Sequence, residues 1–245
     1  MAKREHIIIL ILILFIFVMG MLILSQTLLV DEKSDNSPGM TGHEVIANSS
    51  DDPGSVEVIK NIGNTNSSKK IAYVVGVHPL ESQTHKTLVK LLPNMSNLNF
   101  CYDIYIINVT DDVGYYGDGS SDDSRGRQNG QSLAYRYVYP EIVNGNYDLA
   151  VDIHSNVGAY PYRTFVFSPV KEGLGSEYAR EVSKNCENID YYAPNSTTSG
   201  PFLTMPLNNN GVPAFYFEEY SFAPQNEKDS HMTELISAID NLNFR

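Results

Sequence analysis

A short apolar segment that ends in a histidine constrains the fold of this chain most. Residues 71–77 read Ile-Ala-Tyr-Val-Val-Gly-Val, and such a run is typical of a buried strand in a parallel sheet. His78 follows directly, Pro79 ends the strand, and Glu81 lies one turn into the next element. Because open α/β sheets bind ligands at the carboxyl ends of their strands, the sequence predicts that His78 and Glu81 face such a site.

Strand-like and helix-like segments alternate along the rest of the chain. The apolar patterns predict strands over 101–108, 147–153, 163–168 and 212–217, and helices over 82–92, 131–143, 174–185 and 228–242. A stretch rich in Gly, Asp and Ser, residues 111–130, is predicted to be a loop. The alternation indicates an α/β fold, with a single three-layer α/β/α domain over residues 71–245 and a mostly parallel mixed sheet.

The N-terminal part has a different character. Residues 1–6 form a short basic head, and residues 7–25 are uncharged and almost entirely apolar. At 1.5 Å per residue this run can cross a hydrocarbon core of about 30 Å. A cleaved signal peptide would have a shorter apolar region followed by small residues, so we predict an uncleaved single-pass transmembrane helix with Lys3 and Arg4 inside. Residues 26–70, rich in Asp, Ser, Asn and Gly, are predicted to be a flexible polar tether that holds the domain outside the cytoplasm.

Charge and cysteine content narrow the possible functions. The formal net charge is −12, which argues against nucleic acid as a partner because nucleic acid binding requires basic patches. The two cysteines, Cys101 and Cys186, fit either one disulfide or two thiols. Since the chain has no Cys-x-x-Cys motif, any metal site must use His and carboxylate ligands.

Two further predicted strands also end in polar side chains. Residues 149–155 read Leu-Ala-Val-Asp-Ile-His-Ser and place His154 at a strand end, and the last strand ends in Glu218. Parallel strands of one sheet end at the same edge, so these side chains should share a crevice with His78 and Glu81. Two His and one Glu with an open fourth position form a catalytic zinc set, and a nearby free carboxylate can take a proton from water. Asp152, on the same side of its strand as His154, is placed to orient that ligand.

In this order, the motifs resemble those of the zinc carboxypeptidase superfamily, including its succinylglutamate desuccinylase/aspartoacylase branch. That family has a strand followed by His-x-x-Glu, a later strand ending in Asp-x-His, and a final strand ending in the catalytic Glu. The matching segments here are Gly-Val-His78-Pro-Leu-Glu81, Val-Asp-Ile-His154-Ser and Phe-Tyr-Phe-Glu218. The resemblance implies Zn²⁺ held by His78, Glu81 and His154, with Glu218 as general base and acid. The alternation along the last strand does not by itself exclude the neighbouring Glu219.

One family feature is missing from this sequence. Substrate-binding arginines in the family usually include an Asn-Arg pair, and the nearest equivalent here is Ser-Arg125-Gly-Arg127-Gln-Asn129-Gly. Arg125, Arg127 and Asn129 are therefore candidates for substrate binding. We predict that Arg127, or failing that Arg125, binds a substrate carboxylate or polarises the scissile carbonyl. The alternative is a solvated Gly-rich turn.

These observations predict a membrane-anchored extracellular zinc-dependent hydrolase of an amide bond. Its substrate would be a peptide or an N-acyl amino acid. Two alternatives are a non-catalytic surface module that retains the fold and a zinc cell-wall amidase, although the short interval between His78 and Glu81 argues against the amidase. His and carboxylate ligands suit several divalent ions besides zinc. His85, four residues after Glu81, is predicted to be a neighbour of the site rather than a ligand.

Overall fold

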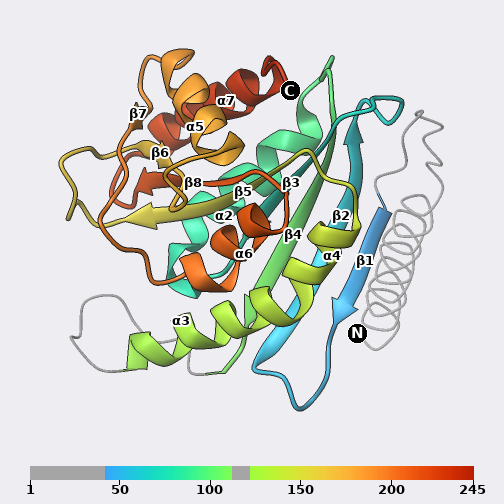
Figure 1. Cartoon of the computed structure of the whole chain (residues 1–245). Helices are drawn as coiled ribbons and strands as arrows, with labels where there is room; N and C mark the ends of the chain where they lie inside the picture. The colour runs from blue at the N-terminus through green and yellow to red at the C-terminus, as the bar shows by residue number, and fades with distance from the viewer. Residues whose placement is uncertain (1–41, 112–121) are drawn as a thin grey trace, which may run out of the picture. The chain divides into compact units, whose positions relative to one another are not determined.

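A computed structural model describes residues 42–111 and 122–245 (Figure 1). The described strands form one eight-stranded sheet in the order β1-β2-β4-β3-β5-β8-β6-β7. Four of its seven strand pairings are parallel and three are antiparallel, so the mixed, mostly parallel sheet agrees with the prediction. The strands are β1 (Gly42–Ala47), β2 (Gly54–Gly63), β3 (Lys70–Val75), β4 (Cys101–Val109), β5 (Leu149–Asn156), β6 (Phe165–Phe167), β7 (Asp190–Tyr191) and β8 (Ala214–Tyr220).

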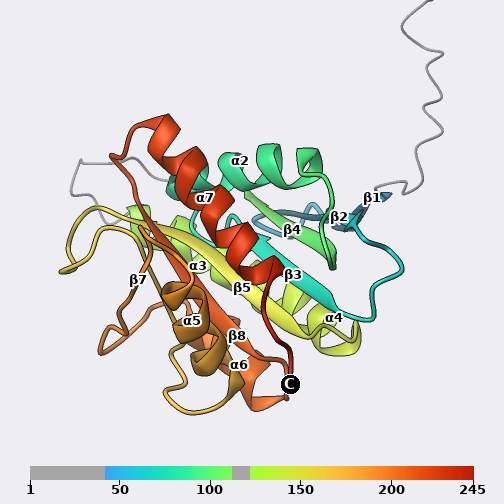
Figure 2. The same cartoon turned by 90° about the horizontal axis from the view of Figure 1, so that it is seen from above.

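Helices cover both faces of the sheet (Figures 1 and 2). One face carries α2 (Ser82–Leu91), α5 (Leu174–Lys184) and α7 (Gln225–Asp240), and the other carries α3 (Asp122–Leu133), α4 (Tyr139–Asn144) and α6 (Thr204–Asn209). Shorter turns are η1 (Pro79–Glu81), η2 (Leu92–Asn94), η4 (Gly200–Phe202) and the π-helical η3 (Ala134–Val138), which joins α3 to α4. The predicted single α/β domain on a mixed sheet is thereby confirmed.

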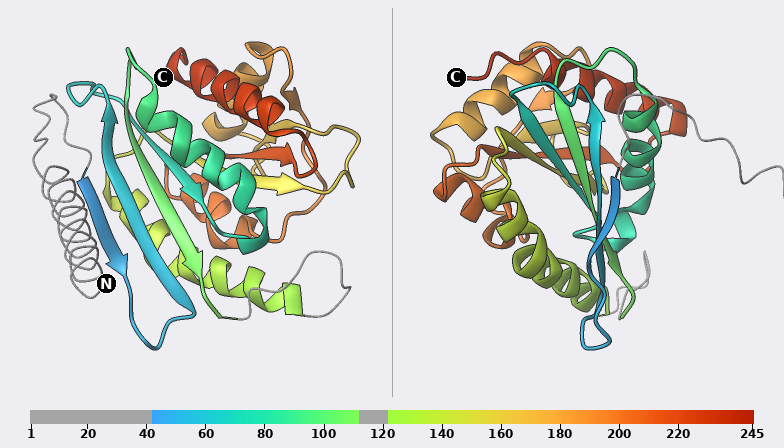
Figure 3. Two further views of the ribbon diagram at one scale, coloured as in Figure 1. Left: turned by 180° about the vertical axis from the view of Figure 1, so that it is seen from behind. Right: turned by 90° about the vertical axis from the view of Figure 1, so that its right-hand side faces the viewer.

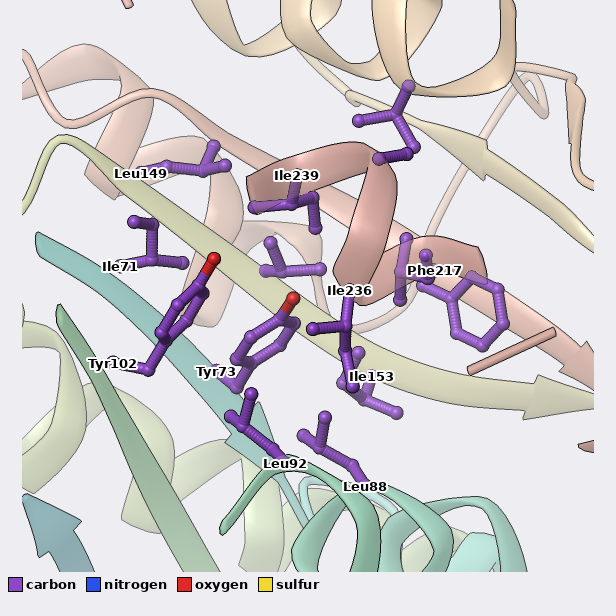
Figure 4. Packing of buried hydrophobic residues seen from close by; sticks show 14 of the residues in the cluster. Ile71, Tyr73, Leu88, Leu92, Tyr102, Leu149, Ile153, Phe217, Ile236 and Ile239 are labelled. Carbon is purple, nitrogen blue, oxygen red and sulfur yellow. The ribbon is translucent and has the colours of Figure 1, made fainter. Parts of the chain in front are cut away.

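Successive side chains along the central strands point to opposite faces of the sheet and pack into two separate core layers. On β3, Tyr73 packs with Leu88 of α2 and Ile236 of α7, as Figure 4 shows. Val74, the next residue, points to the opposite layer, which contains Val138 of η3. All five side chains are buried, and burial of an apolar side chain of this size contributes about 1.5–3 kcal/mol. The sheet is therefore held from both sides, which fixes the strand ends where the candidate site lies.

The prediction of a polar tether over residues 26–70 is wrong for residues 42–63. These residues form β1 and β2, which add an antiparallel pair to one edge of the sheet next to β4 (Figure 3). In β2, Val56 and Val58 are fully buried and alternate with the half-exposed Glu57. This alternation of two spans only a few residues within a polar stretch, and pairing with β4 stabilises it.

The predicted loop over residues 111–130 is also partly wrong, because α3 begins at Asp122 and runs to Leu133. Gly, Asp and Ser have low intrinsic helix propensity, and tertiary packing overrides that preference here. The packing is close at Gly130, where an added Cβ would lie 2.1 Å from the carbonyl oxygen of Val77. Gly130 thus lets α3 approach the loop that carries His78.

Two further predictions concern the cysteines and the membrane. Cys101 is buried and Cys186 half-buried, and both are free thiols, so the open question of a disulfide is answered in favour of two thiols.

The predicted transmembrane helix over residues 7–25 lies outside the described residues and stays a prediction, as does the location outside the cytoplasm. Among the helices of residues 42–111 and 122–245, none is long and apolar enough to span a bilayer.

Candidate active site

The turn after β3 brings His78 and Glu81 to the edge of the sheet. Gly76 has a φ of +92°, and an added Cβ there would lie 1.9 Å from the carbonyl oxygen of Ile107, so only glycine fits. Pro79 then begins the η1 turn, in which the backbone N–H of Glu81 donates to the carbonyl oxygen of His78 at 3.1 Å. This turn places both side chains on the same side of the chain.

The structure brings the three predicted metal ligands together. His78 Nδ1 lies 2.9 Å from Glu81 Oε1, and His154 Nδ1 lies 2.9 Å from Glu81 Oε2. The two Nδ1 atoms are 3.0 Å apart. His78, Glu81 and His154 are all buried, and they form a group of donor atoms that could hold one metal ion.

The donor set fits a catalytic zinc ion. Two imidazole nitrogens and one carboxylate converge without a fourth protein ligand within the described residues, which leaves the open position that a catalytic site requires. Donor separations of 2.9 to 3.0 Å let one ion contact all three atoms, which would move apart slightly to reach the roughly 3.3–3.6 Å between ligands of a tetrahedral zinc ion. Burial alone would raise the pKa of Glu81, but the adjacent imidazoles of His154 and His78 hold that pKa well below its ordinary value. Glu81 is thus kept as the anion that a metal ion needs.

Each imidazole also meets a second polar side chain behind the cluster. Asp152 Oδ1 lies 3.0 Å from His154 Nε2, at ion-pair distance but without the geometry of a hydrogen bond, on the side of β5 that the sequence predicted. Gln131 Nε2, on α3, lies 3.3 Å from His78 Nε2, and the amide can present either its nitrogen or its oxygen to the ring. Such partners fix which ring nitrogen faces the metal. The role of Gln131 was missed because no sequence pattern links α3 to the end of β3.

Glu218, rather than Glu219, faces the site. On the paired strands β5 and β8, Glu218 lies opposite His154. Glu219 points to the other face, where it accepts hydrogen bonds from Thr164 Oγ1 and His231 Nδ1, each at 3.0 Å. Of the two neighbouring carboxylates, Glu218 is therefore the one that faces the site.

Glu218 is half-buried and lines the pocket described below. Its Oε2 atom is buried and has no hydrogen-bond partner in that part of the chain. Burial, with the negative charges of Glu81 and Asp152, raises the pKa of Glu218 to about 8. A bound cation a few ångströms away would lower this pKa and restore a carboxylate that accepts protons near neutral pH.

The three polar residues predicted on α3 do not share one position. Arg127 reaches the site, where its Nη1 donates to Glu81 Oε1 and its Nη2 to Thr198 Oγ1, both at 3.3 Å. Asn129 instead donates to the carbonyl oxygen of Asp111 at 3.0 Å and lies away from the cluster. Arg125 is exposed and does not line the pocket described below. The reason is that this segment is a helix, in which residues two positions apart point in different directions.

A pocket of about 250 Å³ opens beside the cluster. Arg127 and Glu218, which were predicted from the sequence, line it together with the loop of Thr197, Thr198 and Ser199, which was not predicted. These loop residues carry no motif, and only the fold brings them to β8. The remaining wall residues are His78, Glu81, Ser155, Asn156, Val157, Ala159, Tyr160, Phe167 and Tyr216.

His85 is a neighbour of the cluster, as predicted, and its ring Nε2 donates to the carbonyl oxygen of Ile153 at 3.1 Å. Burial lowers the pKa of His85 to about 4, whereas an unfolded histidine titrates near 6.5. Between these values the unfolded chain binds more protons, so stability falls as the pH drops from about 6.5 to 4.

We therefore expect His85 to contribute about 3 kcal/mol to the acid destabilisation of the metal-free protein over that range. Urea unfolding of wild type and His85→Gln in chelator at pH 7 and pH 4 checks this, because Gln retains a donor for Ile153 but does not titrate. Equal losses of unfolding free energy in the two proteins would show that His85 does not carry this pH dependence.

Comparisons with known proteins support the fold. Neither a search with models of protein families nor a search of curated proteins finds a match. Among solved structures, the tripeptide-bound cell shape determinant Csd4 of Helicobacter pylori aligns with a TM-score of 0.51 at 13% identity. That alignment covers 78% of this chain and 56% of Csd4, so the chain spans little more than half of that protein.

Two enzymes described as metallopeptidases align less closely. A metallo-carboxypeptidase of Pseudomonas aeruginosa gives a TM-score of 0.48 at 14% identity, covering 76% of this chain and 60% of that one. A putative metallopeptidase of Shewanella amazonensis gives 0.47 at 13% identity, covering 82% and 86%. At such identities, likeness to solved structures shows the fold alone. The domain therefore shares the fold of Csd4 over most of its length.

Proposed function

We propose that this protein is a zinc-dependent hydrolase of amide bonds, acting on peptides or N-acyl amino acids. One observation carries the proposal: the buried cluster of His78, Glu81 and His154 lies beside Glu218, whose Oε2 atom has no hydrogen-bond partner in the described part of the chain. Metal ligands with an open position next to an unpaired carboxylate oxygen are what metal-assisted hydrolysis requires.

The metal site, Glu218 and Arg127 have different roles in the reaction. Bound Zn²⁺ would supply Lewis acidity, both to the carbonyl under attack and to the attacking water. Glu218 takes a proton from that water and passes it to the leaving nitrogen as the carbon–nitrogen bond breaks. The guanidinium of Arg127 stabilises the negative charge that develops on the carbonyl oxygen.

A non-catalytic binding module is the main alternative. A module that kept only the fold would have no need for the Glu218 carboxylate, whose buried Oε2 atom has no hydrogen-bond partner among the described residues, at a cost in stability. Retention of this group favours chemistry.

The test is to incubate the purified protein, loaded with zinc or stripped by chelator, with short peptides, N-acyl amino acids and cell-wall fragments. Release of amine from peptides or N-acyl amino acids that depends on zinc would support the proposal. Zinc binding without release of amine from any compound would favour the binding module, and release from cell-wall fragments alone would favour the amidase.

Arg127→Ala should lower kcat/KM about 10- to 150-fold. The substitution removes one charged hydrogen bond worth about 1.5–3 kcal/mol in the transition state. Arg125→Ala, on the same helix but outside the pocket, is the matched control and should retain the wild-type value. Both are compared on a peptide with a free C-terminus and on its amide. A larger loss in Arg125→Ala would transfer the role to that residue.

A further inference from the structure

A second cleft adjoins the metal cluster. It measures about 510 Å³, and Glu81 and Ser155 line both this cleft and the first pocket. Both spaces therefore border the proposed metal site. One wall of the second cleft is η1 with the start of α2, and the other is the turn between β8 and α7, which contains Ser221 and Phe222.

The β8–α7 turn is held firmly in place. The backbone N–H of Ser221 donates to the carbonyl oxygen of Asn156 at 2.8 Å, and that of Ala223 donates to Tyr220 at 3.0 Å. The ammonium of Lys228, a side chain that is only 2% exposed, donates to the carbonyl oxygen of Ser221 at 2.7 Å.

Lys228 also ties the two walls to each other. Its Nζ donates to Gln83 Oε1 of α2 at 2.8 Å, so one buried ammonium bridges the helix and the turn. Burying an ammonium group is costly, and hydrogen bonds to both walls offset that cost. The cleft is therefore formed in advance of any ligand.

Phe222 is the most exposed large apolar side chain in the described part of the chain, at 67%. It makes an edge contact with Tyr220, at 5.7 Å between ring centroids, and otherwise faces the cleft opening. Pro79 and Leu80 line the opposite wall. An exposed aromatic ring on a fixed turn beside a reaction centre is a surface for a ligand's apolar group.

The polar groups of this cleft are almost all neutral. Apart from Glu81, which the proposed zinc ion would neutralise, no charged side chain lines it within the described residues. Two hydroxyls of its walls, Thr84 Oγ1 and Ser221 Oγ, are buried without a hydrogen-bond partner in that part of the chain. Walls without net charge suit an uncharged group of a ligand better than an ionised side chain.

We infer that this cleft binds a substrate residue with an uncharged, apolar side chain on the far side of the scissile bond from the first pocket. The inference rests on the proposed function and narrows it. An N-acyl amino acid with a small acyl group would fill only the 250 Å³ pocket and leave the cleft empty. A peptide that continues past the scissile bond fills both, so the substrate class is a peptide.

The experiment compares blocked dipeptides in which the residue before the scissile bond is Leu, Phe, Gly or Asp with the matching N-acetyl amino acids. In the zinc-loaded wild type, the Leu and Phe compounds should give the highest kcat/KM. Phe222→Ala should lower kcat/KM for these two about 10-fold and leave the Gly compound within about twofold, because contact with one exposed ring is lost from an open cleft. Tyr135→Ala removes another exposed aromatic ring outside both clefts and should have no effect.

Three outcomes distinguish a failure of the inference about the cleft from a failure of the proposed hydrolase function. Loss of the apolar preference in Phe222→Ala alone supports the inference. An unchanged preference in that variant, or N-acetyl amino acids hydrolysed as fast as the best dipeptide, overturns the inference while hydrolysis stands. If the wild type hydrolyses none of the compounds, the proposed function fails and the inference fails with it.

Discussion

Glu218→Gln is expected to retain zinc and to hydrolyse its substrate about 10²–10⁴-fold more slowly than the wild type. The amide keeps the size of the side chain but cannot accept a proton from water. Because the variant removes a buried carboxylate whose Oε2 has no hydrogen-bond partner among the described residues, its folded state should be at least as stable as that of the wild type. Steady-state kinetics and metal analysis on the same preparation check both parts.

Glu219→Gln is the matched control, one residue away on the opposite face of β8. Its carboxylate accepts hydrogen bonds from Thr164 and His231, so we expect lower stability with little change in kcat for the folded protein. If Glu219→Gln lost the activity and Glu218→Gln did not, the assignment of the general base would be wrong.

The second large effect concerns the metal. His154→Ala should weaken zinc binding on the order of 100-fold or more, since even partners behind a ligand are worth 10- to 100-fold and His154 supplies a donor atom itself. Competition with a chelating dye measures the affinity. His43→Ala removes an exposed histidine of β1 that contacts Glu57, and it should leave the affinity unchanged. Equal affinities for wild type and His154→Ala would show that His154 is not a ligand.

The parts of the site that lie at strand ends could be predicted from the sequence. Each of β3, β5 and β8 shows a run of apolar residues, and the polar side chain that ends the run is visible without any structure. Because parallel strands end at one edge, His78, His154 and Glu218 were expected at the same edge of the sheet. The neighbouring order of β3, β5 and β8 and the choice between Glu218 and Glu219 needed the observed strand pairing.

The parts that depend on tertiary contacts could not be predicted. In β1 and β2 the apolar pattern is short, and their pairing with β4 is visible only in the fold. The helix that carries Arg127 and Gln131 is rich in residues that disfavour helices, and its position depends on the close contact at Gly130. Thr198 reaches the pocket from a loop without a motif, so no local pattern marks it.

Zinc binding by His78, Glu81 and His154 is tested most directly by a crystal structure of the protein grown with Zn²⁺, with diffraction recorded on both sides of the zinc absorption edge. We expect one strong anomalous peak within about 2.0–2.2 Å of His78 Nδ1, His154 Nδ1 and a carboxylate oxygen of Glu81, beside the Glu218 carboxylate. An anomalous peak elsewhere, or no peak at the cluster in protein saturated with zinc, would contradict it.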